Sequence, residues 1–194
     1  HFAMKVLLKP AKISRFVLRK IGLADSAIGK TEFECPLFYA LNELLQIIFG
    51  ICMSHSANSS KKVVLADADA TDLFAERLAQ ACKSTKAAQP GLVVYLEGDL
   101  GSGKTSLSRR FIQCFIPSAR VKSPTYTLVE SYCLESLCIH HFDLYRLCDP
   151  EELEFIGVRD LLVAPYIALF EWPSKAQGVI PAADLTLRWQ FLDA

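Results

Sequence analysis

The stretch Leu92-Val-Val-Tyr-Leu-Glu-Gly-Asp-Leu-Gly-Ser-Gly-Lys-Thr105 decides the fold of this chain. It opens with an uninterrupted apolar run of strand length, which is typical of a buried strand in a parallel sheet. Residues 98–105 then fit the pattern G-x-x-x-x-G-K-[ST], and a helical pattern follows until Pro117 stops it. A strand, this loop and a helix in that order predict a phosphate-binding loop.

The residue types of the loop suit a polyphosphate. Glycines let backbone N–H groups approach the phosphates, Lys104 is expected between the β- and γ-phosphates, and the Thr105 hydroxyl is expected on Mg²⁺. Ser106, one step into the helix, is expected near the α-phosphate. The loop residues predicted to bind Mg-ATP are Gly98, Asp99, Leu100, Gly101, Ser102, Gly103, Lys104, Thr105 and Ser106.

Two carboxylates follow later apolar strands. Asp143 comes after residues 137–142, and Glu171 comes after residues 166–170, with Trp172 behind it. Ligands of open α/β sheets bind at the carboxyl ends of the strands, so both acids are expected to face the phosphates. Each acid alone could also be a solvated strand-end carboxylate or a helix cap.

Residues 123–127, a hydroxyl-rich loop that contains Thr125, are a candidate segment for sensing the γ-phosphate, although an ordinary turn fits equally well. Arg146 could contact phosphate or a partner, or could pair with Glu151 or Glu152. The consecutive histidines at 140 and 141 should face opposite sides of a strand and are not expected to be ligands.

The remaining pattern alternates strands and helices. Strands are predicted at 63–65, 137–142, 166–170 and 185–189, and an extended segment at 126–132. Helices are predicted from Asp67 onward, after Gly103, and from Pro150 through Leu161 with Asp149 as cap. This order predicts an α/β layered fold of the P-loop NTPase kind, with a mostly parallel central sheet flanked by helices.

Composition limits the function classes. The 194 residues carry 21 Lys and Arg against 21 Asp and Glu, so no overall field attracts nucleic acid or an anionic membrane, and any RNA contact is expected to be local or made through a partner. The seven cysteines are an odd number without a Cys-x-x-Cys pair, which favours small buried thiols in a reducing, cytoplasmic compartment over zinc or disulfide chemistry.

Residues 1–61 are expected to be a leader outside the domain at 62–194. The apolar stretch 37–53 is interrupted by polar residues and is too short for a membrane span, so an amphipathic helix or a signal peptide are its alternatives. The favoured interpretation is that Met53 is a natural start and that residues 1–52 are dispensable.

Five segments together resemble TsaE, also called YjeE, the bacterial ATPase family of the tRNA threonylcarbamoyladenosine pathway. The resemblance covers residues 63–189. The five segments are Gly98-Asp-Leu-Gly-Ser-Gly-Lys-Thr105, Val121-Lys-Ser-Pro-Thr-Tyr-Thr-Leu-Val-Glu130, His141-Phe-Asp-Leu-Tyr-Arg146, Pro150-Glu-Glu-Leu-Glu-Phe-Ile-Gly-Val-Arg-Asp160 and Glu171-Trp-Pro173.

The resemblance implies an ATP cycle that supports the partner proteins TsaB and TsaD. TsaD modifies the adenosine next to the anticodon in tRNAs that read codons beginning with A. The resemblance also implies that Thr105 and Glu171 hold Mg²⁺ and that Asp143 supports hydrolysis. It further implies a switch at residues 123–127, a site shaped by Trp172, and adenine near Ala68.

The family lacks the 52-residue leader and continues past the last strand into a further strand, so the edge of residues 185–189 is expected to be exposed. Two other functions compete with the ATPase. One is a nucleotide-gated protein-binding module without significant turnover. The other is a small-molecule kinase, which is ranked last because only Arg146 and Arg159 could serve a lid.

Overall fold

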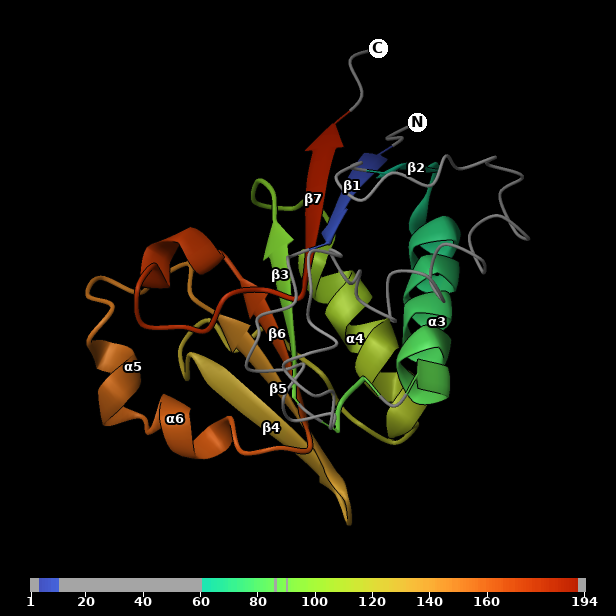
Figure 1. The fold of residues 1–194 in the computed structure, drawn as a ribbon. Helices are drawn as coiled ribbons and strands as arrows, with labels where there is room; N and C mark the ends of the chain where they lie inside the picture. The colour runs from blue at the N-terminus through green and yellow to red at the C-terminus, as the bar shows by residue number, and fades with distance from the viewer. Residues whose placement is uncertain (1–3, 11–60, 86, 90, 192–194) are drawn as a thin grey trace, which may run out of the picture.

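The computed structural model describes residues 4–10, 61–85, 87–89 and 91–191. Its strands form one seven-stranded sheet in the order β2-β1-β7-β3-β6-β5-β4 (Figure 1). The four neighbours β7, β3, β6 and β5 are parallel, and the outer strands pair antiparallel. The strands are β1 (Met4–Pro10), β2 (Lys61–Leu65), β3 (Leu92–Glu97), β4 (Val129–Leu134), β5 (Leu137–Asp143), β6 (Tyr166–Glu171) and β7 (Leu185–Phe191).

Helices cover both faces of the sheet, which confirms the predicted α/β layered fold. The long helices α3 (Ala68–Thr85) and α4 (Lys104–Phe115) lie on one face (Figure 1). The short elements α5 (Glu152–Phe155), α6 (Val158–Leu161) and η2 (Pro173–Ala176) lie on the other. Asp67 starts α3, since its Oδ1 accepts a hydrogen bond from the Ala70 N–H at 2.8 Å.

The alternation of side chains along β6 divides the core into two layers. Ile167 and Leu169 pack with the α3 and α4 face, whereas Ala168 and Phe170 pack with the α5 and α6 face. All residues of β6 are buried, as a central parallel strand requires. Burying each large apolar side chain stabilises the fold by about 1.5–3 kcal/mol, so this strand holds the carboxyl edge of the sheet firmly.

The first strand departs from the prediction of a leader outside the domain. Residues 4–10 pair antiparallel with β7 from Met4↔Phe191 to Pro10↔Leu185, and with β2 on the other side. The expected exposed edge at 185–189 is therefore covered, because a strand edge with open N–H and C=O groups accepts a further strand. The predicted features at residues 37–53, including Met53, lie outside the described residues.

Two local predictions were wrong in detail. The single helix expected from Pro150 to Leu161 is broken into α5 and α6 at Gly157, which has a left-handed φ of 70°. The extended segment expected from residue 126 begins only at Val129, because residues 125–127 form a turn that ends at Leu128 with φ 62°.

The cysteines also differ from the prediction of buried thiols. Cys82 is buried, as expected, but Cys133 and Cys138 form a disulfide across the hairpin of β4 and β5. Cys148 is exposed. Within the described parts of the chain, no helix is both long and apolar enough for a membrane crossing.

Candidate functional site

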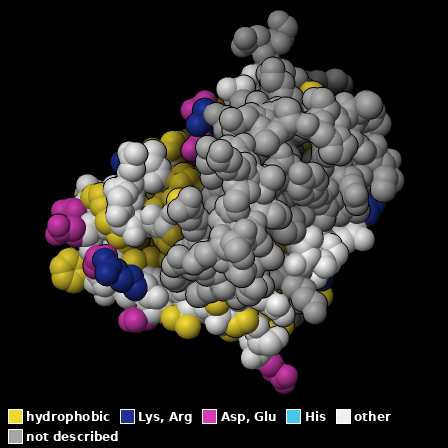
Figure 2. Space-filling view, in the orientation of Figure 1, with side chains coloured by type: hydrophobic (Ala, Val, Ile, Leu, Met, Phe, Trp, Pro, Cys, Tyr) yellow, Lys and Arg dark blue, Asp and Glu magenta, His cyan; other side chains and the backbone are white. Residues whose placement is uncertain are grey.

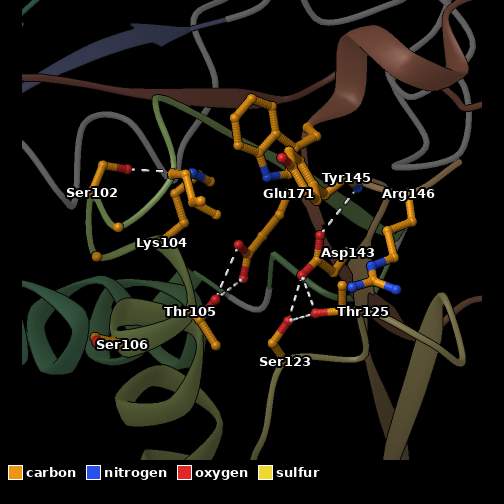
Figure 3. A pocket seen from close by; sticks show the side chains of 14 residues that line it. Ser102, Lys104, Thr105, Ser106, Ser123, Thr125, Asp143, Tyr145, Arg146 and Glu171 are labelled. Atoms are coloured by element: carbon orange, nitrogen blue, oxygen red, sulfur yellow. Dashed lines mark hydrogen bonds between the residues drawn. The ribbon is translucent and has the colours of Figure 1, made fainter.

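A pocket of about 490 Å³ lies where the strands β5 and β6 end and α4 begins (Figure 3). The structure brings most of the predicted site residues together around it. The lining residues are Leu100, Gly101, Ser102, Gly103, Lys104, Thr105, Ser106, Ser123, Thr125, Asp143, Tyr145, Arg146, Glu171 and Trp172.

The loop is shaped by its glycines. Gly103 precedes α4 with φ 95° and leaves the helix start without a side-chain cap. A Cβ on Gly98 would lie 2.8 Å from Trp189 Cβ, so a side chain there has no room. Because the first turn of a helix has N–H groups without helical acceptors, this uncapped start suits an anion.

Lys104 is the cation at the centre of the pocket and is 4% exposed. Its Nζ donates to the carbonyl oxygens of Gly98 and Asp99, both at 2.7 Å, and lies 4.4 Å from the centre of the Trp172 ring. Burial lowers the pKa of Lys104, and the nearby charge of Glu171 acts in the opposite direction. The Lys104 ammonium is thus held by the carbonyl oxygens of the loop residues Gly98 and Asp99.

Glu171 connects the end of β6 to the loop. Thr105 Oγ1 lies 2.8 Å from Glu171 Oε1 and 3.1 Å from Oε2, and donates its one proton to this carboxylate (Figure 3). His141 Nε2 lies 2.8 Å from the same Oε1. The buried Glu171 carboxylate therefore lies beside the Thr105 hydroxyl. These are the two oxygen ligands predicted to hold Mg²⁺.

Asp143 lies beside Glu171 in the register of β5 and β6 but has other partners. Its Oδ2 accepts from the hydroxyls of Ser123 and Thr125, and its Oδ1 accepts from the Tyr145 N–H at 3.1 Å (Figure 3). The hydroxyl-rich loop is therefore tied to the acid at the end of β5. This contact brings Ser123 and Thr125 to the pocket, and it is compatible with both a switch and an ordinary turn.

Aromatic side chains form one wall of the pocket. Trp172 and Tyr145 are in tilted contact with ring centres 5.1 Å apart, and Trp172 has a left-handed φ of 58°. A bulky residue in that region carries backbone strain, which is typical of a functional position. Arg146 lies over the Tyr126 ring at 4.4 Å, so the alternative of a surface pair with Glu151 or Glu152 is not what the structure shows.

Three predicted residues do not line the pocket. Ala68 is the exposed first residue of α3, and Gly98 and Asp99 contact Lys104 through their carbonyl oxygens instead. His141 was missed, although the prediction that the two histidines face opposite sides is confirmed. His140 contacts Ser131, and His141 contacts Glu171. The signal was available in its spacing, since His141 lies two residues before Asp143 on one face of the strand.

The residues present fit a nucleotide with its cation. Among the described residues, no group of three or more His, Cys, Asp and Glu side chains is placed to hold a metal. Mg²⁺ does not need one, because it is usually bound through one or two carboxylates together with phosphate oxygens and water. The Thr105–Glu171 pair fits the cation. The uncapped start of α4 and the close approach at Gly98, which has no room for a Cβ, fit the phosphates.

Comparison with known proteins places the chain in a family. The profile of the threonylcarbamoyl adenosine biosynthesis protein TsaE matches residues 65–193. The chain belongs to the TsaE family. It is 50% identical over 105 residues to tRNA threonylcarbamoyladenosine biosynthesis protein TsaE of Haemophilus influenzae, a match that covers 54% of this chain and 66% of that protein.

A further relative agrees with this TsaE assignment. The Rickettsia felis protein of the same name is 33% identical over 132 residues, covering 68% of this chain and 73% of the relative. The crystal structure of YdiB from Bacillus subtilis has a TM-score of 0.40 and 22% identity over 65% of this chain and 80% of that one. The family assignment therefore rests on sequence.

Proposed function

We propose that this TsaE family member binds Mg-ATP in the pocket, hydrolyses it, and supports the formation of threonylcarbamoyladenosine in tRNA. The observation that carries the proposal is the hydrogen bond between Thr105 Oγ1 and Glu171 at the same pocket as Lys104. It joins the phosphate-binding loop to a buried carboxylate from a distant strand. The relatives' names supply the pathway.

The loop binds the nucleotide in this proposal. Lys104 exchanges its carbonyl acceptors for phosphate oxygens, and the N–H groups at the start of α4 donate to the remaining oxygens. Thr105 and Glu171 would hold Mg²⁺, which when bound neutralises charge on the phosphates. Trp172 closes the site above the Lys104 ammonium.

Asp143 positions the attacking water. Its two oxygens accept from Ser123, Thr125 and the Tyr145 N–H, and a carboxylate offers about four acceptor sites. One site therefore remains for a water on the pocket side. Because the same carboxylate holds residues 123–127, a change at the γ-phosphate would move this loop.

The loop at residues 123–127 also favours a second candidate function, a nucleotide-gated protein-binding module. Tyr126 is 83% exposed and lies next to Thr125, which contacts Asp143. An exposed aromatic joined to the nucleotide site is suited to a protein partner, and we propose TsaB and TsaD as partners in the cytoplasm, with tRNA contacted indirectly. The kinase alternative loses support, since Arg159 pairs with Glu154 at 2.6 Å.

ATP turnover by the purified chain, alone and with TsaB, TsaD and tRNA, tests the proposal. We expect slow hydrolysis that requires Mg²⁺ and increases with the partners. Nucleotide binding without turnover under any of these conditions would favour the nucleotide-gated module. The absence of nucleotide binding would remove both functions.

A further inference from the structure

His141 makes a contact that the proposed roles do not use. Its Nε2 lies 2.8 Å from Glu171 Oε1, and the two side chains are 0% and 3% exposed. His141 is on β5, and Glu171 is the last residue of β6. The pair therefore joins two neighbouring strands beneath the pocket.

The chemistry of the contact fixes its direction. An ionised carboxylate only accepts hydrogen bonds, so His141 Nε2 must carry the proton and donate it to Glu171. The other ring nitrogen, Nδ1, is buried and has no hydrogen-bond partner within the described structure. The His141 ring therefore makes its hydrogen bond within the described structure to Glu171.

A role in filling the core does not explain this histidine. A buried leucine or phenylalanine would fill the space without the cost of burying an unpaired ring nitrogen, which is about 1–3 kcal/mol. The neighbouring His140 also has a buried ring nitrogen, Nε2, without a hydrogen-bond partner, but its Nδ1 contacts Ser131, which does not line the pocket. The polar group of His141 is directed at the site.

Glu171 needs such a partner to keep one orientation. Its Oε1 is 2.8 Å from both His141 Nε2 and Thr105 Oγ1. Without the histidine, Thr105 alone would orient the carboxylate, and the same threonine must turn its oxygen toward the cation. Groups that orient a metal-binding carboxylate typically contribute 10–100-fold to metal affinity.

We propose that His141 is a positioning residue that holds Glu171 Oε1 through Nε2, so that the carboxylate remains directed at the Mg²⁺ position beside Thr105. The inference rests on the proposed function. It predicts that loss of the Nε2–H weakens Mg²⁺ binding, so that more Mg²⁺ is needed for tight nucleotide binding, and leaves the metal-free affinity nearly unchanged, because the loop contacts are separate.

The test is calorimetric titration of a non-hydrolysable ATP analogue into the full chain, in EDTA and over a range of Mg²⁺ concentrations. His141→Leu should need at least about tenfold more Mg²⁺ for tight binding, with metal-free affinity within about twofold of the unchanged chain. His141→Gln, whose Nε2–H can reach the carboxylate, should recover most of the loss. His140→Leu is the matched control and should keep the original Mg²⁺ dependence.

The outcomes separate the two proposals. If the unchanged chain binds no analogue, the proposed function fails. If it binds with Mg²⁺ dependence and His141→Leu behaves identically, the positioning role alone is overturned. Should His141→Leu not fold, His141→Gln is compared with the shorter His141→Asn, and an equal Mg²⁺ dependence of these two would overturn the role.

Discussion

The glycine-rich loop and the acidic strand ends meet in one pocket but are built in different ways. Residues 98–105 are contiguous and shape their part of the pocket mainly through backbone conformation. Asp143 and Glu171 come from two strands, and only the register Asp143↔Glu171 places them side by side. The loop is thus a local feature, whereas the acidic edge is a product of the whole sheet.

The two regions also differ in charge, and the proposed function gives them different roles. The loop holds the cation Lys104, and the strand ends hold two buried carboxylates that are 5% and 2% exposed. The loop should therefore determine nucleotide affinity, and the strand ends should determine metal use and turnover. Substitutions in each region can separate these two effects.

The largest effect is expected in the loop. Lys104→Ala removes the buried cation proposed to neutralise the phosphates, so ATP hydrolysis should fall to the background of the buffer. Phosphate release is the measurement, and Lys83→Ala on α3, where Nζ contacts the Cys114 carbonyl, is the control. Retained hydrolysis in Lys104→Ala would show that the loop is not the phosphate site.

The strand ends should affect turnover more than affinity. Glu171→Gln removes the charge proposed to bind Mg²⁺, and turnover should fall about a hundredfold or more, the equivalent of about 2.7 kcal/mol, while ATP affinity changes only a few-fold. Steady-state kinetics and calorimetry on the same samples measure the two quantities. If Asp143→Asn abolishes turnover while Glu171→Gln retains it, the two acids exchange their assigned roles.

The sequence alone predicted the loop at residues 98–105 well. The loop pattern lies between an apolar run and a helical pattern, and those neighbours fix its conformation. The positions of Asp143 and Glu171 were also predicted, because parallel strands end at the same edge. The spacing of His141 and Asp143 indicates that both lie on one face of the strand, but the contact of His141 with Glu171 also depends on the register of β5 and β6, which the sequence does not determine.

A smaller effect is expected from the hydroxyls that hold Asp143. Ser123→Ala and Thr125→Ala each remove one donor to Oδ2, so turnover should fall about threefold to tenfold while ATP affinity stays the same. Thr127→Ala, an exposed neighbour, is the control. Equal turnover in all three variants would show that residues 123–127 do not act through Asp143.

The fold predictions failed where distant pairing or one glycine decided the outcome. Residues 4–10 carry no motif, and only their pairing with β7 places them in the sheet. The start of the helix expected from Pro150 was predicted with the correct capping residue, since Asp149 Oδ1 accepts a hydrogen bond from the Glu151 N–H at 2.9 Å. Gly157 nevertheless ends it early in the left-handed region.

The smallest effect is expected in the binding of tRNA to the isolated chain. The chain has no net charge, and its central cation Lys104 is buried, so neither region offers a basic surface for a phosphate backbone. A mobility assay at physiological salt should show no submicromolar binding of tRNA to the isolated chain. Tight binding that weakens steeply with salt would make this a direct RNA-binding protein.

Calorimetric titration of ATP in the presence of Mg²⁺, into the unchanged chain and into Lys104→Ala, tests the central claim most directly. The account predicts one ATP per chain, with an affinity at least about tenfold weaker in the variant, because a charge-assisted contact of about 1.5–3 kcal/mol is lost. The same affinity in both proteins, or no binding to the unchanged chain at millimolar ATP, would contradict it.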